Sequence, residues 1–188
     1  MAGRSARGTE MGAEANPIAA PLAEVARKHI DGATGIAGLK RLSGGASQEI
    51  WSFDATTSDG AVPLILRRAP GGVRDTGRSG TAVALETEAE LIRLAGAAGV
   101  PVPPVRHVLT EEDGIGQGFV MDRIPGETLA RKILRDEEFA EARPKLARQC
   151  GEVIARLHKI DKATLPQLRV ATGKDEVEQY FQTYKQLD

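Results

Sequence analysis

The stretch LKRLSGGASQEIWSFDATTSDGAVPLILRRAP, residues 39–70, decides the fold of this 188-residue chain. It contains short runs of strand-forming residues, separated by a turn of small residues at 43–47 and by Ser58-Asp59-Gly60. Trp51 and Phe53 lie two residues apart and therefore on the same face of the second run. Strand-forming runs joined by short glycine-containing turns predict three consecutive antiparallel strands.

Helices and further strands are expected on both sides of this meander. Apolar residues at helical spacing predict a helix from Pro17 to about His29. After the meander, the pattern predicts a helix from near Thr81 to about Gly96, strands at 105–109 and 118–124, and helices at 128–134, 138–159 and 175–187. The fold class is therefore α+β, with an antiparallel sheet of about five strands, a helix packed on it, and a helical segment that follows.

Composition narrows the classes of function. The sequence has 25 Lys and Arg against 26 Asp and Glu, and this balance argues against a nucleic-acid partner. The single cysteine, Cys150, excludes an intrachain disulfide and a Cys-based zinc site. We expect Cys150 to lie on the buried face of its helix. No apolar run approaches the roughly 20 residues of a membrane span, and no signal peptide is visible, so we expect a cytoplasmic protein without a membrane partner.

Glu88 is the most informative acidic residue. At 100° per residue it falls within the apolar stripe of its predicted helix, whereas Glu86 and Glu90 point to the opposite side. The apolar residues of this stripe are Ala84, Leu85, Leu91, Ile92 and Ala95. A carboxylate in such a position needs a cationic partner, because its unpaired burial costs several kcal/mol. The basic strand end Arg67-Arg68 is the expected source of that cation.

The two arginines at the end of the third strand must point to opposite faces of the sheet. Arg67 shares a face with Ile65, and Arg68 shares the other face with Leu64 and Leu66. One of the two cations is therefore directed toward an interior or a cleft, and the alternation alone leaves open which one.

A strand cation paired with a carboxylate on the next helix, beneath a glycine-rich hairpin, resembles the small lobe of kinase-like phosphotransferases. Five motifs in order strengthen the likeness: LSGGASQEIW, LILRR, ETEAELIRLA followed by GVPVPPV, GQGFVMDRIPGETL and GEVIARLHKID. Together they resemble the aminoglycoside phosphotransferase family over about residues 37–188. The most similar branch is that of bacterial phosphotransferases related to the kinase-like domains attached to acyl-CoA dehydrogenases.

This resemblance implies a nucleotide site. The nucleotide-loop positions fall on Ser43, Gly44, Gly45, Ala46 and Ser47. The strand lysine that touches the α and β phosphates falls on Arg67, and the helix carboxylate falls on Glu88. The adenine-binding hinge falls on 119–124, with Met121, Asp122 and Arg123 at its centre. Arginine at the lysine position is a departure from the family pattern. Its guanidinium fork keeps a permanent charge but is larger than an ammonium group, which changes the geometry with which it can bind phosphate. The implied reaction moves the γ-phosphoryl of ATP, or alternatively GTP, with Mg²⁺, to a hydroxyl of a small molecule.

The family's catalytic motif is not found in this sequence. It consists of His-x-Asp with an asparagine five residues after the aspartate, followed by a metal-binding aspartate. His29-Ile30-Asp31 has the first spacing, but it precedes the glycine turn and Ile36 stands where the asparagine belongs. The one asparagine of the sequence is Asn16. We therefore expect neither a catalytic nor a metal-binding residue here, with the catalytic loop beyond Asp188.

The expected organisation follows the two lobes of such kinases. Residues 1–16 form a disordered tail, 17–124 a kinase-like small lobe with its hinge at 119–124, and 125–188 the first helices of an incomplete large lobe. The alternative is a non-catalytic nucleotide-binding or interaction module. The acceptor substrate and the oligomeric state cannot be read from the sequence.

Overall fold

The computed structural model describes residues 16–42, 48–72, 83–168 and 172–186. The expected tail, apart from Asn16, and the expected nucleotide loop at 43–47 therefore lie outside the described residues. The expected helix start near Thr81 lies outside them as well.

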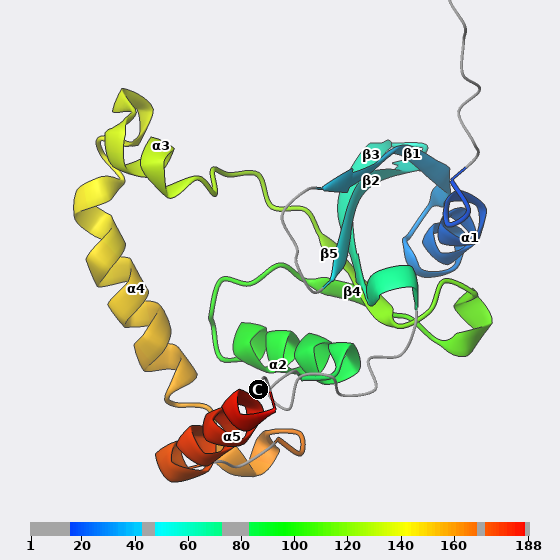
Figure 1. Ribbon diagram of the computed structural model, residues 1–188. Helices are drawn as coiled ribbons and strands as arrows, with labels where there is room; N and C mark the ends of the chain where they lie inside the picture. The colour runs from blue at the N-terminus through cyan, green and yellow to red at the C-terminus, as the bar shows by residue number, and fades with distance from the viewer. Residues whose placement is uncertain (1–15, 43–47, 73–82, 169–171, 187–188) are drawn as a thin grey trace, which may run out of the picture.

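A five-stranded antiparallel sheet is the centre of the fold (Figure 1). Its strands are β1 (Ala33–Leu42), β2 (Glu49–Thr57), β3 (Gly60–Arg68), β4 (Val105–Val108) and β5 (Gly118–Asp122). The spatial order is β1-β2-β3-β5-β4. The predicted meander is confirmed, since Thr57 pairs with Gly60 across the β2–β3 turn and Glu49 pairs with Arg68 at the other end. Strand β5 then pairs with β3, which places the predicted hinge beside the central strand.

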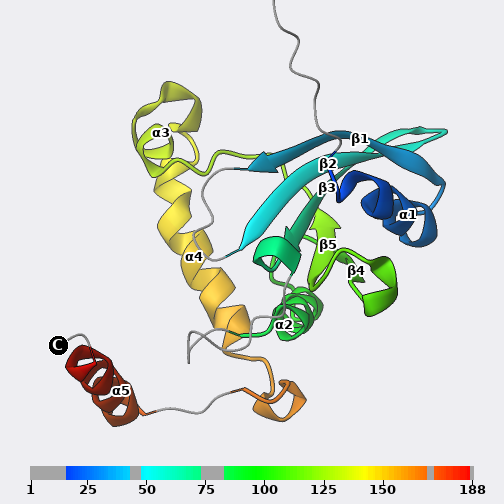
Figure 2. The same ribbon diagram turned by 45° about the vertical axis from the view of Figure 1, so that its right-hand side comes forward.

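Helix α1 (Ala19–His29) covers one face of the sheet (Figure 2). Its buried residues pack on alternate residues of the strands, which explains the helical spacing seen in the sequence. This core cluster includes Leu22, Val25, Ala26, Phe53, Leu64, Leu66 and Val120. Asn16 stabilises the start of the helical segment, because its side-chain oxygen accepts a hydrogen bond from the Ile18 N–H at 3.2 Å.

Helix α2 (Leu85–Ala97) covers the opposite face. Leu85 and Ala89 are buried against Ala69 and Phe119. Phe119 and Val120 are neighbours in β5, and their membership in different core clusters shows that the central strands are buried on both faces. The sheet is therefore the middle layer between two helices.

Two turns contact each other at one end of the sheet, at positions that glycine occupies. The short 3-10 turn η1 (Pro70–Gly72) lies against the loop that follows the 3-10 turn η2 (Glu111–Asp113). Gly72 and Gly116 both have positive φ, at 73° and 81°. A Cβ on Gly116 would lie 2.1 Å from the Gly72 carbonyl oxygen, so the two backbones approach more closely than any side chain permits. Gly116 thus serves the contact between the β4–β5 hairpin loop and η1.

Beyond β5 the chain is helical, as predicted, but the helix bounds differ. The elements are α3 (Ala130–Arg135), the 3-10 turn η3 (Glu137–Phe139), α4 (Arg143–Leu157), the 3-10 turn η4 (Lys162–Thr164) and α5 (Gly173–Lys185). The predicted start of the long helix at Glu138 is wrong. Pro144 stands at the beginning of α4, where its missing N–H breaks no helical hydrogen bond, and a separate 3-10 turn precedes it.

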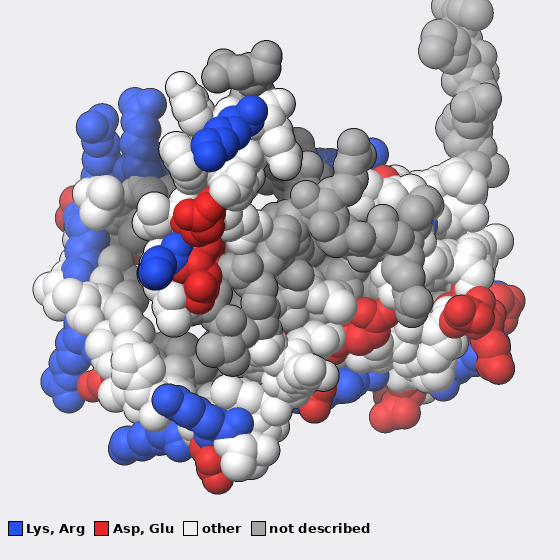
Figure 3. Space-filling model, turned by 60° about the horizontal axis from the view of Figure 1, so that its bottom comes forward, with Lys and Arg blue, Asp and Glu red and all other residues white. Residues whose placement is uncertain are grey.

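The helices α4 and α5 keep their apolar residues exposed. On α4, Ile154 is 51% exposed, and on α5 Val177 and Phe181 are 70% and 50% exposed. Cys150 is also exposed, which corrects the expectation that it faces a helix core. These exposures show that α5 does not cover the apolar side chain of Ile154 on α4. Lys and Arg side chains gather on the side of the molecule where Figure 1 places α3 and α4 (Figure 3).

Within the residues that the structure describes, none of the helices has the length and apolar character needed to cross a membrane.

We expect amide hydrogen exchange to differ between the buried strands of the sheet and the exposed helices α4 and α5. Amide protons of β2, β3 and β5 should exchange slowest, because their strands are paired and buried on both faces, whereas those of α4 and α5 should exchange at least tenfold faster. Exchange measured by mass spectrometry on peptides of the whole chain checks this. Protection of α5 equal to that of β3 would contradict it.

Candidate functional site

An ion pair joins β3 to α2. Arg67 Nη2 lies 3.0 Å from Glu88 Oε1, and the two side chains are 33% and 25% exposed. Arg67 leaves the sheet on the face that α2 covers, and Glu88 belongs to the first turn of α2, where the helix dipole favours a negative charge. The ion pair predicted from the sequence is confirmed.

The position of Glu88 on its helix explains why it is only half-buried. On one side of it, Leu85, Ala89 and Ile92 pack toward the sheet. On the other side, Leu91 and Ala95 line a cavity of about 510 Å³ that the end of α4 and the η4 segment complete. The apolar stripe of α2 is thus divided between the sheet and this cavity, and Glu88 lies between the two parts.

The neighbouring acidic residue is placed differently from the prediction. Glu86 was expected to point away from the packed face, yet its carboxylate accepts a hydrogen bond from the Gln117 side chain at 2.9 Å. Gln117 precedes β5, so α2 is anchored to the sheet at two points, through Glu88 and through Glu86.

Arg67 has a second partner at the beginning of β2. Its Nε donates a hydrogen bond to the side-chain oxygen of Gln48. Gln48 directly follows the predicted nucleotide loop, 43–47, which lies outside the described residues. The guanidinium is therefore held from both sides, by α2 and by the residue next to that loop. Among the described residues, none accepts a hydrogen bond from its Nη1.

Arg68 is buried on the opposite face of the sheet, with 8% exposure. Its Nε lies 2.8 Å from Glu49 Oε2, and its Nη1 donates to the Ile115 carbonyl at 3.1 Å. Arg68 is therefore the arginine that the alternation directs into the interior, and each of the two arginines at the end of β3 has its own carboxylate partner.

Glu49 connects several segments at this end of the sheet. Besides Arg68, it accepts hydrogen bonds from the Gly71 N–H at 3.2 Å and the Trp51 ring N–H at 3.3 Å. Burial by itself would raise the pKa of the Glu49 carboxyl, but the bonds from Gly71 and Arg68 outweigh it and leave the pKa lowered. The sequence analysis missed Glu49. The available signal was that Glu49, Trp51 and Phe53 alternate along one face of β2, directly opposite Arg68.

The side chains of the predicted hinge are engaged within the protein. Arg106 holds the Asp122 carboxylate through two hydrogen bonds, at 2.6 and 2.9 Å. Arg123 binds Ser52 at 2.6 Å and Asp54 at 2.7 Å on β2. These contacts fix the end of β5 against both sides of the sheet.

The backbone of the hinge is only partly available to a ligand. The N–H groups of Asp122 and Arg123 donate to the carbonyls of Pro104 and Pro63, each at 3.0 Å. Pro63 has no N–H to return, so it cannot donate to the Arg123 carbonyl. Of the predicted adenine-binding groups between Met121 and Arg123, the last two N–H groups are therefore occupied, and carbonyl oxygens remain the candidate contacts.

The antiparallel sheet, the α2 helix on one face and the β3–α2 ion pair define a kinase-like phosphotransferase lobe. The model of the phosphotransferase enzyme family matches residues 38–188. This match covers most of the sequence, and the chain belongs to that family.

A solved structure supports the same fold. The chain is similar to the crystal structure of a "putative aminoglycoside phosphotransferase" from Ralstonia eutropha JMP134, with a TM-score of 0.60 and 19% sequence identity over 88% of this chain. The matched part is 46% of that protein, so the chain spans about half of its length. No curated protein matches the sequence. The resemblance to aminoglycoside phosphotransferases inferred from the five motifs is confirmed, while the nucleotide-binding roles of individual residues stay predictions.

We expect Glu49→Ala to lower the free energy of unfolding by about 3 kcal/mol, because it leaves the buried Arg68 without its charge partner. Urea unfolding followed by circular dichroism measures the change. Arg41→Ala is the control, since Arg41 lies 3.5 Å from the same carboxylate but is 58% exposed. Equal losses in the two variants would contradict the structural role of the buried pair.

A second substitution at this position, Glu49→Gln, should change the acid dependence of stability, as urea unfolding at several pH values measures. The pKa of Glu49 is lower in the folded chain than its ordinary value of 4.5. Its contribution is therefore present above pH 4.5 and is lost as the pH falls through the folded pKa. The stability difference between the parent chain and Glu49→Gln should shrink in that range.

Proposed function

We propose that this chain forms the nucleotide-binding part of an ATP-dependent small-molecule kinase. The enzyme transfers the γ-phosphoryl of ATP to a hydroxyl of a small molecule. The observation that carries this proposal is the Arg67–Glu88 pair at 3.0 Å, placed between α2 and the residue that follows the glycine turn.

Arg67 is suited to bind the α and β phosphates. Glu88 and Gln48 fix two of its nitrogens, and a guanidinium carries five N–H donors and a permanent charge. Holding the cation before the nucleotide arrives reduces the ordering that binding requires. The backbone N–H groups of 43–47 would cover the phosphates, because small residues let a backbone approach an anion closely.

The hinge favours a base that donates hydrogen bonds. With the Asp122 and Arg123 N–H groups occupied, the backbone offers carbonyl acceptors, which suit the amino group of adenine. The corresponding position of guanine is a carbonyl oxygen, which cannot donate. Guanine also carries N–H donors, at N1 and at its 2-amino group, so the hinge carbonyls suit either base, and the choice of ATP rests on the likeness to the phosphotransferase enzyme family.

The described residues do not form a Mg²⁺ site next to Arg67. Mg²⁺ prefers carboxylate and water oxygens, and the Glu88 carboxylate is already bound to Arg67. The group of possible metal ligands found among the described residues lies elsewhere, at His29, His107 and Asp113. We therefore assign neither a Mg²⁺ ligand nor a catalytic base to the described part of the chain.

Arg67→Ala should weaken ATP binding by at least tenfold, because a hydrogen bond to a charged group contributes about 1.5–3 kcal/mol. Calorimetric titration of the chain with ATP measures this. Arg67→Lys should retain most of the affinity. Arg148→Ala, which removes an 85% exposed cation on α4, should leave it unchanged. Unchanged affinity in a folded Arg67→Ala variant would refute the proposed site.

We also expect this 188-residue chain to bind ATP without turnover. Its one asparagine, Asn16, is bound to the Ile18 N–H before α1, and His29 ends that helix on the other side of the sheet from α2. A coupled assay of ADP release checks this expectation. ADP release that Arg67→Ala abolishes would show a catalytic group that this proposal lacks.

A further inference from the structure

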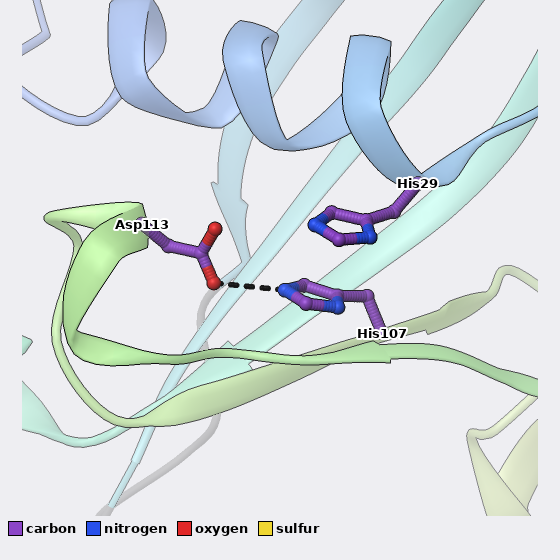
Figure 4. Close-up of side chains that lie close together, drawn as sticks. All are labelled: His29, His107 and Asp113. Atoms are coloured by element: carbon purple, nitrogen blue, oxygen red, sulfur yellow. Dashed lines mark hydrogen bonds and ion pairs between the residues drawn. The ribbon is translucent and has the colours of Figure 1, made fainter.

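Three potential metal ligands meet where α1 ends against the β4–β5 hairpin (Figure 4). His29 is the last residue of α1, His107 belongs to β4 and Asp113 belongs to η2. One ligand atom from each of the three lies within 4.8 Å of the other two. His107 Nε2 is 2.8 Å from Asp113 Oδ2, and the His29 and His107 rings stack with their centroids 3.5 Å apart.

This cluster is separate from the proposed nucleotide site. Helix α1 precedes residue 38, where the match to the family model begins. It packs on the face of the sheet opposite α2 and Glu88. The proposed nucleotide site uses none of the three residues, although His107 and Asp113 lie within the matched range.

The donor set fits a zinc ion. Imidazole nitrogens and a carboxylate oxygen are ordinary Zn²⁺ ligands, and three of them leave the fourth tetrahedral position for water. The carboxylate is already oriented, because the Thr110 N–H and hydroxyl bind Asp113 Oδ2 at 2.8 and 3.2 Å. Hydrogen bonds of this kind to a ligating group are typical of protein metal sites.

The charges of the cluster also favour a cation. The Asp113 carboxylate supplies a negative charge, and ligand atoms of His29 and His107 lie within 4.8 Å of it. Carboxylate oxygens and imidazole nitrogens are both ordinary ligand atoms of Zn²⁺.

Zinc binding requires a local rearrangement, because the His107 nitrogen that now shares a hydrogen bond with Asp113 Oδ2 must give up this contact to direct a lone pair at the ion. The two rings are within 10° of parallel, so their nitrogen lone pairs run side by side and must converge on a common point. Zn–N and Zn–O distances of about 2.0–2.2 Å require the ligand atoms to approach one another more closely than now. His29 is exposed at the end of its helix, so its ring can move with little loss of packing beyond the stack on His107, whereas Asp113 is buried and held.

We propose that His29, His107 and Asp113 bind one Zn²⁺ ion, which fastens the end of α1 to the β4–β5 hairpin. The site does not depend on the proposed nucleotide site. It joins an element outside the family match to the hairpin whose second strand leads into the hinge.

Titration of the metal-free chain with Zn²⁺, in competition with a chromophoric chelator, tests this proposal. One Zn²⁺ should bind per chain, and His29→Ala and His107→Ala should each weaken binding at least tenfold. His158→Ala is the matched control, because the sequence has 3 histidines and His158 lies after α4, outside the cluster. Cys150→Ser is the second control, since the exposed thiol is itself a possible zinc ligand. Both controls should bind like the parent chain.

A second measurement keeps the test valid if His107→Ala fails to fold. His29 is exposed, so His29→Gln should retain the fold, as circular dichroism checks, while losing the rise in melting temperature that Zn²⁺ gives the parent chain. Co²⁺ in place of Zn²⁺ should give the visible bands of a tetrahedral site in the parent chain and not in His29→Gln. The proposal is overturned if no binding is detected at 100 µM Zn²⁺, a concentration on the order of 10³ times a sub-micromolar Kd. Equal binding by the His29 variants, or loss of binding in a control variant, overturns it too.

Discussion

The two adjacent arginines at the end of β3 impose the constraint on which the rest of this structure depends. Alternation along a strand sends Arg67 and Arg68 to opposite faces of a sheet that helices cover on both sides. Each guanidinium therefore needs its own carboxylate, because an unpaired buried charge is costly. Glu88 supplies one from α2 and Glu49 supplies the other from β2. The two pairs tie α2, the η1 turn and the β4–β5 loop to the same end of β3.

The two pairs differ in burial, and the difference fits two separate roles. The side chains of Arg68 and Glu49 are 10% and 11% exposed, and their contacts to Gly71 and Ile115 hold two turns together. Arg67 is 33% exposed, and its Nη1 is not hydrogen-bonded to any of the described residues. A half-exposed, oriented cation can exchange water for a phosphate, whereas a buried one has no such access. The same strand end thus combines a structural ion pair with a candidate anion-binding group.

Local patterns were sufficient to predict much of this molecule. The strand meander, α1 and the Arg67–Glu88 pair depend on alternation, helical periodicity and the cost of burying a carboxylate, all of which can be read over a few residues. The start of α4 and the exposure of Cys150 could not be read in this way. Amphipathic periodicity shows which face of a helix is apolar, but it does not show whether another element covers that face. The segment 43–47 lies outside the described residues, so its predicted role stays a prediction.

The His29–His107–Asp113 cluster escaped the sequence analysis for a geometric reason. The register of β4 shifts between Val105 and His107, and such an irregularity redirects the side chains that follow it. Simple alternation therefore cannot tell which side of the sheet His107 faces. In the sequence, His29 was considered only as part of the His29-Ile30-Asp31 spacing. Its partners in the structure, His107 and Asp113, come from the distant β4–β5 hairpin. A spacing motif records neighbours along the chain, but a ligand set is defined by neighbours in space, which here only the packing of α1 on the sheet brings together.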